Sequence, residues 1–146
     1  MRLSVCIAAG LALTFPAWAQ PLDPKKSADQ VQRYLQVLTT CQTQGLTDMI
    51  DPEVSSIGLR GAFAQSRPLY VQAVQAQCAM GVKLDLQTKI LRHSEFNDIA
   101  ITALELTGSS VVAGKTTPAD LRVTLVLRRG SDGVWRILHT QTATAF

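Results

Sequence analysis

Charge is scarce in this sequence, and the little that is present forms no run of one sign. Lysine and arginine total 14 against 11 aspartates and glutamates, a net charge of +3. The basic pairs Lys25-Lys26 and Arg128-Arg129 stand alone, one in a polar N-terminal stretch and one beside a turn. A nucleic-acid-binding protein typically carries a basic stripe or patch, so this composition argues against nucleic acid as a partner. Both pairs are interpreted as solvated surface charge.

The motifs of several enzyme classes are also missing. Gly108–Thr116 has five residues between its glycines where a phosphate-binding loop needs four, and Pro118 follows where a helix would be needed. His93-Ser94-Glu95 has the His-x-Glu of zinc deaminases but no Pro-Cys-x-x-Cys after it, so a solvated strand end is expected there rather than a metal site. A Gly-x-Ser-x-Gly motif is absent too. No metal and no cofactor are predicted.

The most informative stretch that is present covers residues 1–19, which have the form of a secretory signal peptide. Met1-Arg2-Leu3 is a positively charged start, Val5 to Phe15 is an uncharged apolar run, and Ala17-Trp18-Ala19 has the small residues that a signal peptidase reads. The run is too short to span a bilayer, which takes about 20 apolar residues, and no second such run exists. A buried N-terminal helix is the alternative. We expect an exported protein, periplasmic or secreted, without a membrane span.

Of the three cysteines, Cys6 would leave with the signal peptide and Cys41 and Cys78 would remain. Each of the two lies on the apolar face of a predicted helix. An even pair in an oxidising compartment favours a disulfide. The alternative is two buried thiols that act as small hydrophobic side chains, because a helix face alone does not fix the Cα distance that a bridge requires.

The first half of the mature chain has helical periodicity. Residues 20–27 are expected to be a flexible lead, with two prolines and two lysines. Ser27-Ala28-Asp29-Gln30 has the form of a capping box, and apolar residues at helical spacing continue toward Gly45, which is expected to end the helix. A short helical turn at residues 46–50 and a strand at 54–59 follow. A second long helix is predicted from Ser66 to Gly81, with Pro68 in its first turn.

After residue 81 the apolar residues alternate with polar ones, which predicts strands. Residues 82–90 alternate, and a break at Leu91 indicates a bulge. Further strands are predicted at 99–106, at 121–128 and from Trp135 onward, with a loop over 107–119 and a hairpin turn at Asp132-Gly133. Two helices followed by a four-stranded antiparallel meander define an α+β fold, with the helices on one face of a curved sheet.

Four motifs in this order resemble the NTF2-like superfamily, in particular its SnoaL-like and ketosteroid-isomerase-like branch. They are the capped first helix leading to Gly45–Ile50, the short strand and turn before Ser66, Asn97–Ile101, and Gly133–His139. The resemblance implies a cone-shaped, cystatin-like fold over residues 28–146, in which the curved antiparallel sheet wraps around a pocket that the N-terminal helices cap on the concave face. It also implies that a homodimer is possible.

Isomerase chemistry in this branch needs a carboxylate base in the pocket, with a tyrosine and a protonated acid that stabilise the enolate oxygen. The position of the base corresponds to Ile57 here, and its neighbours Ser56 and Gly58 are no better suited. Tyr34 lies on the first helix, about one turn early relative to the family's tyrosine. The resemblance therefore gives this chain no catalytic residues.

Five side chains are candidates for lining the pocket: His139, Gln141, Trp135, Tyr34 and Tyr70. Alternation along the last strand predicts that His139 shares a face with Trp135, Ile137 and Gln141, and bulky apolar partners of that kind normally face a core. Histidine can take up and release a proton near neutral pH, which makes His139 the strongest polar candidate. The alternative is a core or rim histidine whose ring nitrogens are satisfied by a neighbour.

Three functional hypotheses remain open. The first is an exported, non-catalytic module that binds a small apolar ligand or a protein. The second is an enzyme of the cyclase, isomerase or dehydratase type that uses His139 as acid or base and Tyr34 or Tyr70 as donor. The third is an interaction subunit of a cell-envelope complex that works through the outer face of its sheet. A deep polar pocket would favour the enzyme, and a filled interior would favour the other two.

We expect cleavage after Ala19 when the full chain is expressed in a bacterial host. The charged start, apolar run and Ala-x-Ala ending are the grounds for this expectation. N-terminal sequencing of periplasmic protein should read Gln20 first. A product that begins at Met1 would contradict it.

Overall fold

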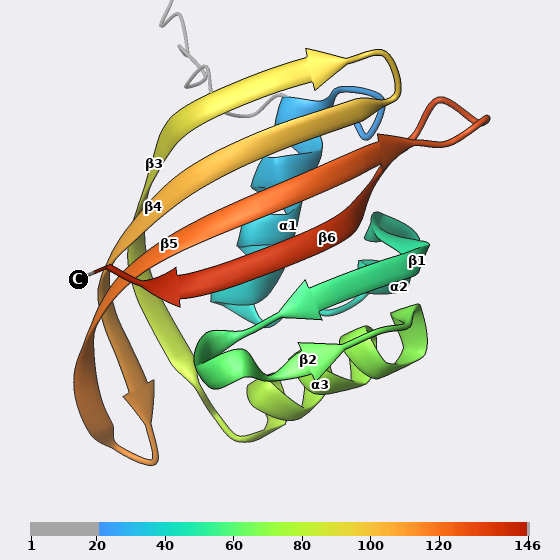
Figure 1. The fold of residues 1–146 in the computed structure, drawn as a ribbon. Coiled ribbons are helices and arrows are strands. Elements are labelled where there is room, and N and C mark those ends of the chain that lie inside the picture. Colours follow the sequence, from blue (N-terminus) through green and yellow to red (C-terminus); the bar gives the residue numbers. More distant parts are fainter. Residues whose placement is uncertain (1–20, 146) are drawn as a thin grey trace, which may run out of the picture.

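A computed structural model describes residues 21–145, and the predicted signal peptide lies outside them. Figure 1 shows a sheet that curves around helix α1. None of the helices among the described residues is long and apolar enough to cross a membrane. The elements are, in chain order, α1 (Ser27–Thr40), α2 (Leu46–Met49), β1 (Ile50–Ile57), the 3-10 turn η1 (Leu59–Gly61), β2 (Phe63–Ala64), α3 (Arg67–Ala79), β3 (Lys83–Phe96), β4 (Ile99–Val112), β5 (Lys115–Arg129) and β6 (Trp135–Thr144).

The sheet has the strand order β2-β1-β6-β5-β4-β3. Strands β3 to β6 form the predicted antiparallel meander. Strand β1 pairs with β6 in parallel, so the sheet is mixed rather than purely antiparallel. The helices lie on the face that the sheet curves around, which we call the inner face, and the opposite face is the outer face (Figure 1). The prediction of an α+β fold with a curved sheet and helices on one face is confirmed.

Helix α1 differs from the prediction at both ends. It ends at Thr40 rather than near Gly45, because Cys41 adopts a left-handed conformation with φ of 56° and its N–H bonds to the carbonyl of Val37. Gly45 instead precedes α2. The capping box is also wrong: Ser27 is the first helical residue, and its hydroxyl is bonded to strand β3 rather than to the helix backbone.

The expected loop over residues 107–119 is instead the paired end of two long strands. Strand β4 continues to Val112, and β5 begins at Lys115 after a tight turn. Gly108 permits this pairing, because a Cβ there would lie 2.0 Å from the carbonyl oxygen of Asp85 on β3. The predicted bulge in β3 is confirmed by a register shift between Ile90 and Arg92.

The core fills the space between the helices and the inner face of the sheet. From α1, the side chains of Val31, Tyr34 and Val37 are buried at helical spacing. Alternate residues of the sheet meet them, and full burial of one such large apolar side chain contributes about 1.5–3 kcal/mol. The fully buried apolar side chains include Leu46, Ile50, Val54, Leu104, Leu125, Leu127, Trp135 and Ile137.

The predicted disulfide is present between Cys41 and Cys78, whose Cα atoms are 5.5 Å apart. It joins the residue that follows α1 to the last turn of α3. The bond therefore fixes the position of α1 relative to α3, two helices that lie on either side of β1 and β2 in the sequence.

Replacing both cysteines, as Cys41→Ser/Cys78→Ser, should lower the free energy of unfolding by about 4 kcal/mol. The bond joins cysteines 37 residues apart, and the loop that it closes reduces the conformational entropy of the unfolded chain. This entropy difference gives the expected magnitude. Equilibrium urea unfolding measures it, and wild-type protein reduced with dithiothreitol should match the variant. Equal stability of oxidised wild type and variant would contradict the prediction.

Candidate functional site

A bulge in β6 places the three predicted pocket residues of this strand, Trp135, His139 and Gln141, on different faces of the sheet. Leu127 of β5 pairs with Ile137, but the residue before it, Val126, pairs with His139. Leu138 is therefore an extra residue in β6 with no partner on β5. The side chains on the two sides of this bulge therefore alternate in opposite phase. Trp135 and Ile137 face the core, whereas His139 and Gln141 face outward.

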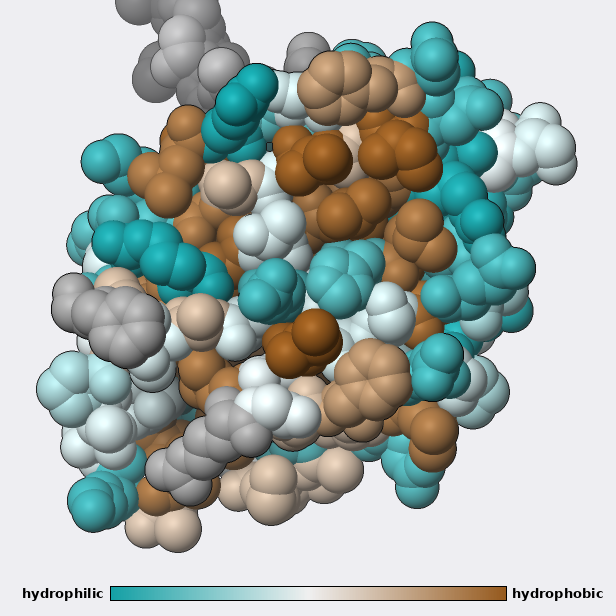
Figure 2. Space-filling model, in the orientation of Figure 1, coloured by the Kyte–Doolittle hydropathy of each residue, from teal (hydrophilic) through white to brown (hydrophobic). Residues whose placement is uncertain are grey.

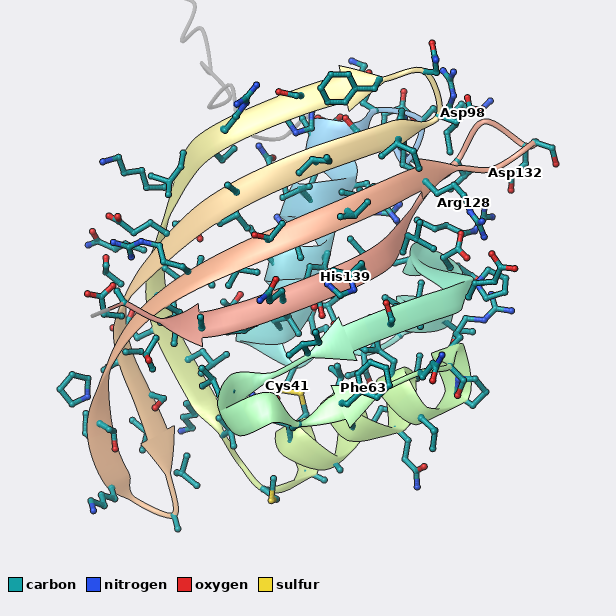
Figure 3. All side chains as sticks on the ribbon, viewed as in Figure 1. Cys41, Phe63, Asp98, Arg128, Asp132 and His139 are labelled. Carbon is teal, nitrogen blue, oxygen red and sulfur yellow. A yellow bond between two sulfur atoms is a disulfide. The ribbon has the colours of Figure 1, made fainter. Side chains whose placement is uncertain are left out.

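The prediction that His139 shares an inward face with Trp135 is therefore wrong. His139 is half-buried on the outer face, where its Nδ1 lies 2.8 Å from Oγ of Ser55 on β1 (Figure 3). Its cross-strand neighbour on β5 is Val126. Gln141 is exposed beside Ile57 on β1, so it does not line an interior pocket either.

Tyr34 and Tyr70, predicted separately as pocket candidates, lie side by side in the interior. Both side chains are buried, and their hydroxyl groups are hydrogen-bonded to each other between α1 and α3. Tyr70 is also bonded to Thr140 on β6, whose Oγ1 lies 2.7 Å from Oγ of Ser56 on β1. The four hydroxyl groups form a chain that connects two helices to two strands.

Burial keeps these phenols neutral. Loss of solvent around the Tyr34 hydroxyl raises its pKa well above the usual 10.0, and the neighbouring Tyr70 raises it further. Burial also raises the pKa of Tyr70, although its hydrogen bonds to Tyr34 and Thr140 act in the opposite direction. Neutral phenols with raised pKa values donate hydrogen bonds but do not abstract protons at neutral pH.

A second, partly buried polar cluster, which was not predicted from the sequence, fastens the start of α1 to the sheet. The Ser27 hydroxyl donates to Glu95, which leaves its oxygen free to accept from Nε2 of His93 at 2.9 Å. The hydroxyl of Thr102 on β4 then donates to Nδ1 of His93 at 2.8 Å. His93 and Glu95 were both expected at a solvated strand end: Glu95 is exposed near the end of β3, whereas His93 is half-buried. Among residues 21–145, no group of three or more His, Cys, Asp and Glu side chains is placed to hold a metal ion.

The position of the isomerase base is on the wrong face for catalysis. Ile57 is exposed on the outer side of β1, next to Phe63 of β2. The buried carboxylate of the same strand, Asp51, is occupied by Arg128, which donates to both of its oxygens at 2.6 and 3.0 Å. Asp51 therefore serves as an ion-pair partner that joins β1 to β5.

Apolar side chains gather over part of the outer face, with polar side chains between and beside them (Figure 2). Ile101 on β4 lies in the cross-strand row that contains Val126 and His139. A groove of ≈ 260 Å³ runs along its upper edge between β3 and β4, lined by Arg92, Ser94, Phe96, Ile101 and Ala103. The large apolar side chains exposed on this face include Ile57 (38%), Phe63 (61%), Phe96 (58%) and Ile101 (41%).

The fold and this division of its faces define the class of protein, a helix-capped curved sheet of the NTF2-like or cystatin-like kind. The family model of the SnoaL-like domain matches residues 28–145. The chain belongs to this family. None of the curated proteins compared with it is similar in sequence at a significant level.

Solved structures of the same fold come from several bacteria. A ketosteroid isomerase-like protein from Erwinia carotovora atroseptica has a TM-score of 0.72 and 16% identity, over 79% of this chain and 90% of that one. A putative calcium/calmodulin-dependent protein kinase type II association domain from Thiobacillus denitrificans has a TM-score of 0.72 and 15% identity, over 87% and 100%. An NTF2-like protein of unknown function in nutrient uptake from Rhodospirillum rubrum has a TM-score of 0.70 and 15% identity, over 83% and 99%. At these identities the likeness establishes the fold alone.

The buried tyrosine pair predicts a specific loss of stability at alkaline pH. Both pKa values are raised in the folded protein above the usual 10.0, so the folded state holds these protons more tightly than the unfolded state. The resulting contribution is fully present below pH 10 and is lost as the pH rises above it. The difference in urea-unfolding free energy between wild type and Tyr34→Phe/Tyr70→Phe should therefore be constant from pH 7 to 9 and shift against wild type beyond pH 10. A constant difference up to pH 11 would refute the prediction.

Proposed function

We propose that this protein is an exported, non-catalytic SnoaL-like module that binds protein through the outer face of its sheet, in the first instance a second copy of itself. The observation that carries this proposal is the set of large apolar side chains exposed on four strands of that face, Ile57, Phe63, Phe96 and Ile101. Large apolar side chains that gather on one exposed face of a protein are typical of a contact with another protein. The groove of ≈ 260 Å³ is smaller than the roughly 300–1,000 Å³ of typical small-ligand pockets, which favours a protein over a small apolar ligand.

A second copy of the chain is the partner that matches this face most simply. In a twofold dimer the same patch meets itself, so each apolar row is covered by the apolar row of the other protomer. His139 and Gln141 would lie near the middle of the contact, where their polar atoms need partners across it. A cell-envelope protein with an apolar sheet face is the alternative occupant.

The arrangement of the inner face supports a binding role over the isomerase-type alternative. The tyrosine hydroxyls bond to each other and to Thr140, and Trp135 and the aliphatic core pack around them. A proton-transfer enzyme needs a base within reach of its substrate, and His139, the residue considered for that role, lies on the opposite face of the sheet.

Export is supported by the N-terminal sequence and agrees with the Cys41–Cys78 bond. Structural disulfides are typical of the periplasm and the cell exterior and rare in the cytosol. The partner is therefore expected in the same compartment.

Placing a charge among the apolar side chains of the outer face should prevent self-association. Ile101→Glu would put a carboxylate among Val126 and its apolar neighbours, where burial without a counter-charge is strongly unfavourable. Sedimentation velocity should show a dimer for wild type and a monomer for Ile101→Glu at concentrations up to about 100-fold above the wild-type Kd.

Leu69→Glu is the matched control, since Leu69 is also exposed but belongs to α3 on the other side of the molecule. It should sediment like wild type. If the wild type is monomeric but binds an envelope protein, and Ile101→Glu abolishes that binding, the partner of the outer face is the envelope protein and not a second copy of the chain. A wild type that is monomeric and binds no periplasmic protein would refute the proposed function.

A further inference from the structure

A polar groove separate from the outer face lies beside the second half of α1. It has a volume of ≈ 630 Å³ and is bounded by α1, by the loop that follows Cys41, and by α2. Val37 and Met49, both buried, form its apolar floor. The carboxamides of Gln36, Gln42 and Gln44 line its sides, and all three residues are exposed.

One cation, Arg33, lines this groove and is hydrogen-bonded to a buried residue. Its Nη1 donates to Oε1 of Gln30 at 3.0 Å, and Gln30 is completely buried. Within residues 21–145, no carboxylate lies within salt-bridge distance of Arg33, and no acidic side chain is among the residues that line the groove. Arg33 therefore presents an oriented guanidinium whose remaining N–H groups are available to a ligand.

The orientation of the Gln30 carboxamide leaves one of its polar atoms without a hydrogen bond, which lowers stability. Its Nε2 is buried and has no hydrogen-bond partner among residues 21–145. Rotating the carboxamide would place its NH₂ group against the guanidinium of Arg33, two donors face to face, so the cation fixes the present orientation. Buried polar groups are nearly always bonded, and exceptions concentrate at functional sites. Gln30 thus acts as a positioning residue for Arg33.

We propose that this groove binds the end of a short extended peptide, with the free C-terminal carboxylate on Arg33. The planar fork of a guanidinium matches a carboxylate with two parallel charge-assisted hydrogen bonds. Each glutamine carboxamide offers one acceptor and two donors, the set that complements the N–H and C=O groups of a peptide backbone. A carboxylate ligand without amide groups would leave these three glutamines unused.

The length of the groove sets the size of the ligand. Arg33 and Thr40 both line it, and seven residues of α-helix at about 1.5 Å each place them about 10 Å apart. An extended peptide rises about 3.3 Å per residue, so roughly three residues span this distance. The loop that carries Gln42 and Gln44 follows Cys41 directly, so the disulfide fixes one wall.

The test compares acetyl-trialanine with a free carboxylate against the same peptide as a C-terminal amide, by isothermal titration of the mature, oxidised protein. The carboxylate form should bind at least about tenfold more tightly, the ratio expected for one charge-assisted pair. Arg33→Gln should remove this difference. Lys115→Gln, which removes the same charge at the distant β4–β5 turn, should retain it, and Ile101→Glu should retain it as well because its change lies on the outer face.

Gln30→Met separates positioning from a structural role. Methionine has a similar shape and no amide, so the variant removes the unpartnered Nε2 and releases Arg33. Peptide affinity should fall severalfold while the Tm is maintained or rises. Equal affinity for the two peptides, no binding of either, or full discrimination by Arg33→Gln would overturn the assignment of the site. A lower Tm with unchanged affinity would overturn the positioning role of Gln30.

Discussion

The attachment of helix α1 at three points along one face is the constraint on which the rest of the structure depends. Ser27 is bonded to His93 and Glu95 on β3, Tyr34 to Tyr70 on α3, and Cys41 to Cys78 at the end of α3. These three α1 positions are seven residues apart, so they lie along nearly the same line of the helix. Two attachments are hydrogen bonds and one is a disulfide, and together they fix α1 to β3 and to α3 from its first residue to the residue that follows it.

This fixation decides which surfaces remain for recognition. The buried stripe of α1 fills the concavity of the sheet with Val31, Tyr34 and Val37, and the tyrosine pair uses its hydrogen-bonding groups internally. The same helix exposes its other side, where Arg33 and Gln36 contribute to the polar groove. The outer face of the sheet is left uncovered, with its apolar rows. An inner packed layer thus separates two surfaces of opposite character, one apolar and one polar.

The sequence predicted the elements that repeat a simple period and failed where the chain interrupts it. The bulge at Leu91 was predictable because an apolar residue fell in a polar position. The bulge at Leu138 left no such trace, because Ile137 and Leu138 are both apolar and His139 fits either phase. That single extra residue moved His139 and Gln141 to the outer face. Residues 107–119 read as a loop because serine, glycine and threonine dominate them, although pairing with β3 holds the first of them in a strand.

Two polar residues in the buried stripe of α1 indicate contacts of this helix that apolar periodicity does not reveal. Ser27 and Gln30 are completely buried at helical spacing with Tyr34, yet apolar pattern matching discounts both. The burial of Ser27 is explained by a partner on β3, sixty-six residues away in sequence. Gln30 has a partner for its oxygen only, and that partner is a cation that lines a groove. A buried polar residue whose hydrogen bonds are all made specifies how two elements pack, whereas one that lacks a partner costs stability. For Gln30, this cost is accompanied by the hydrogen bond that orients Arg33.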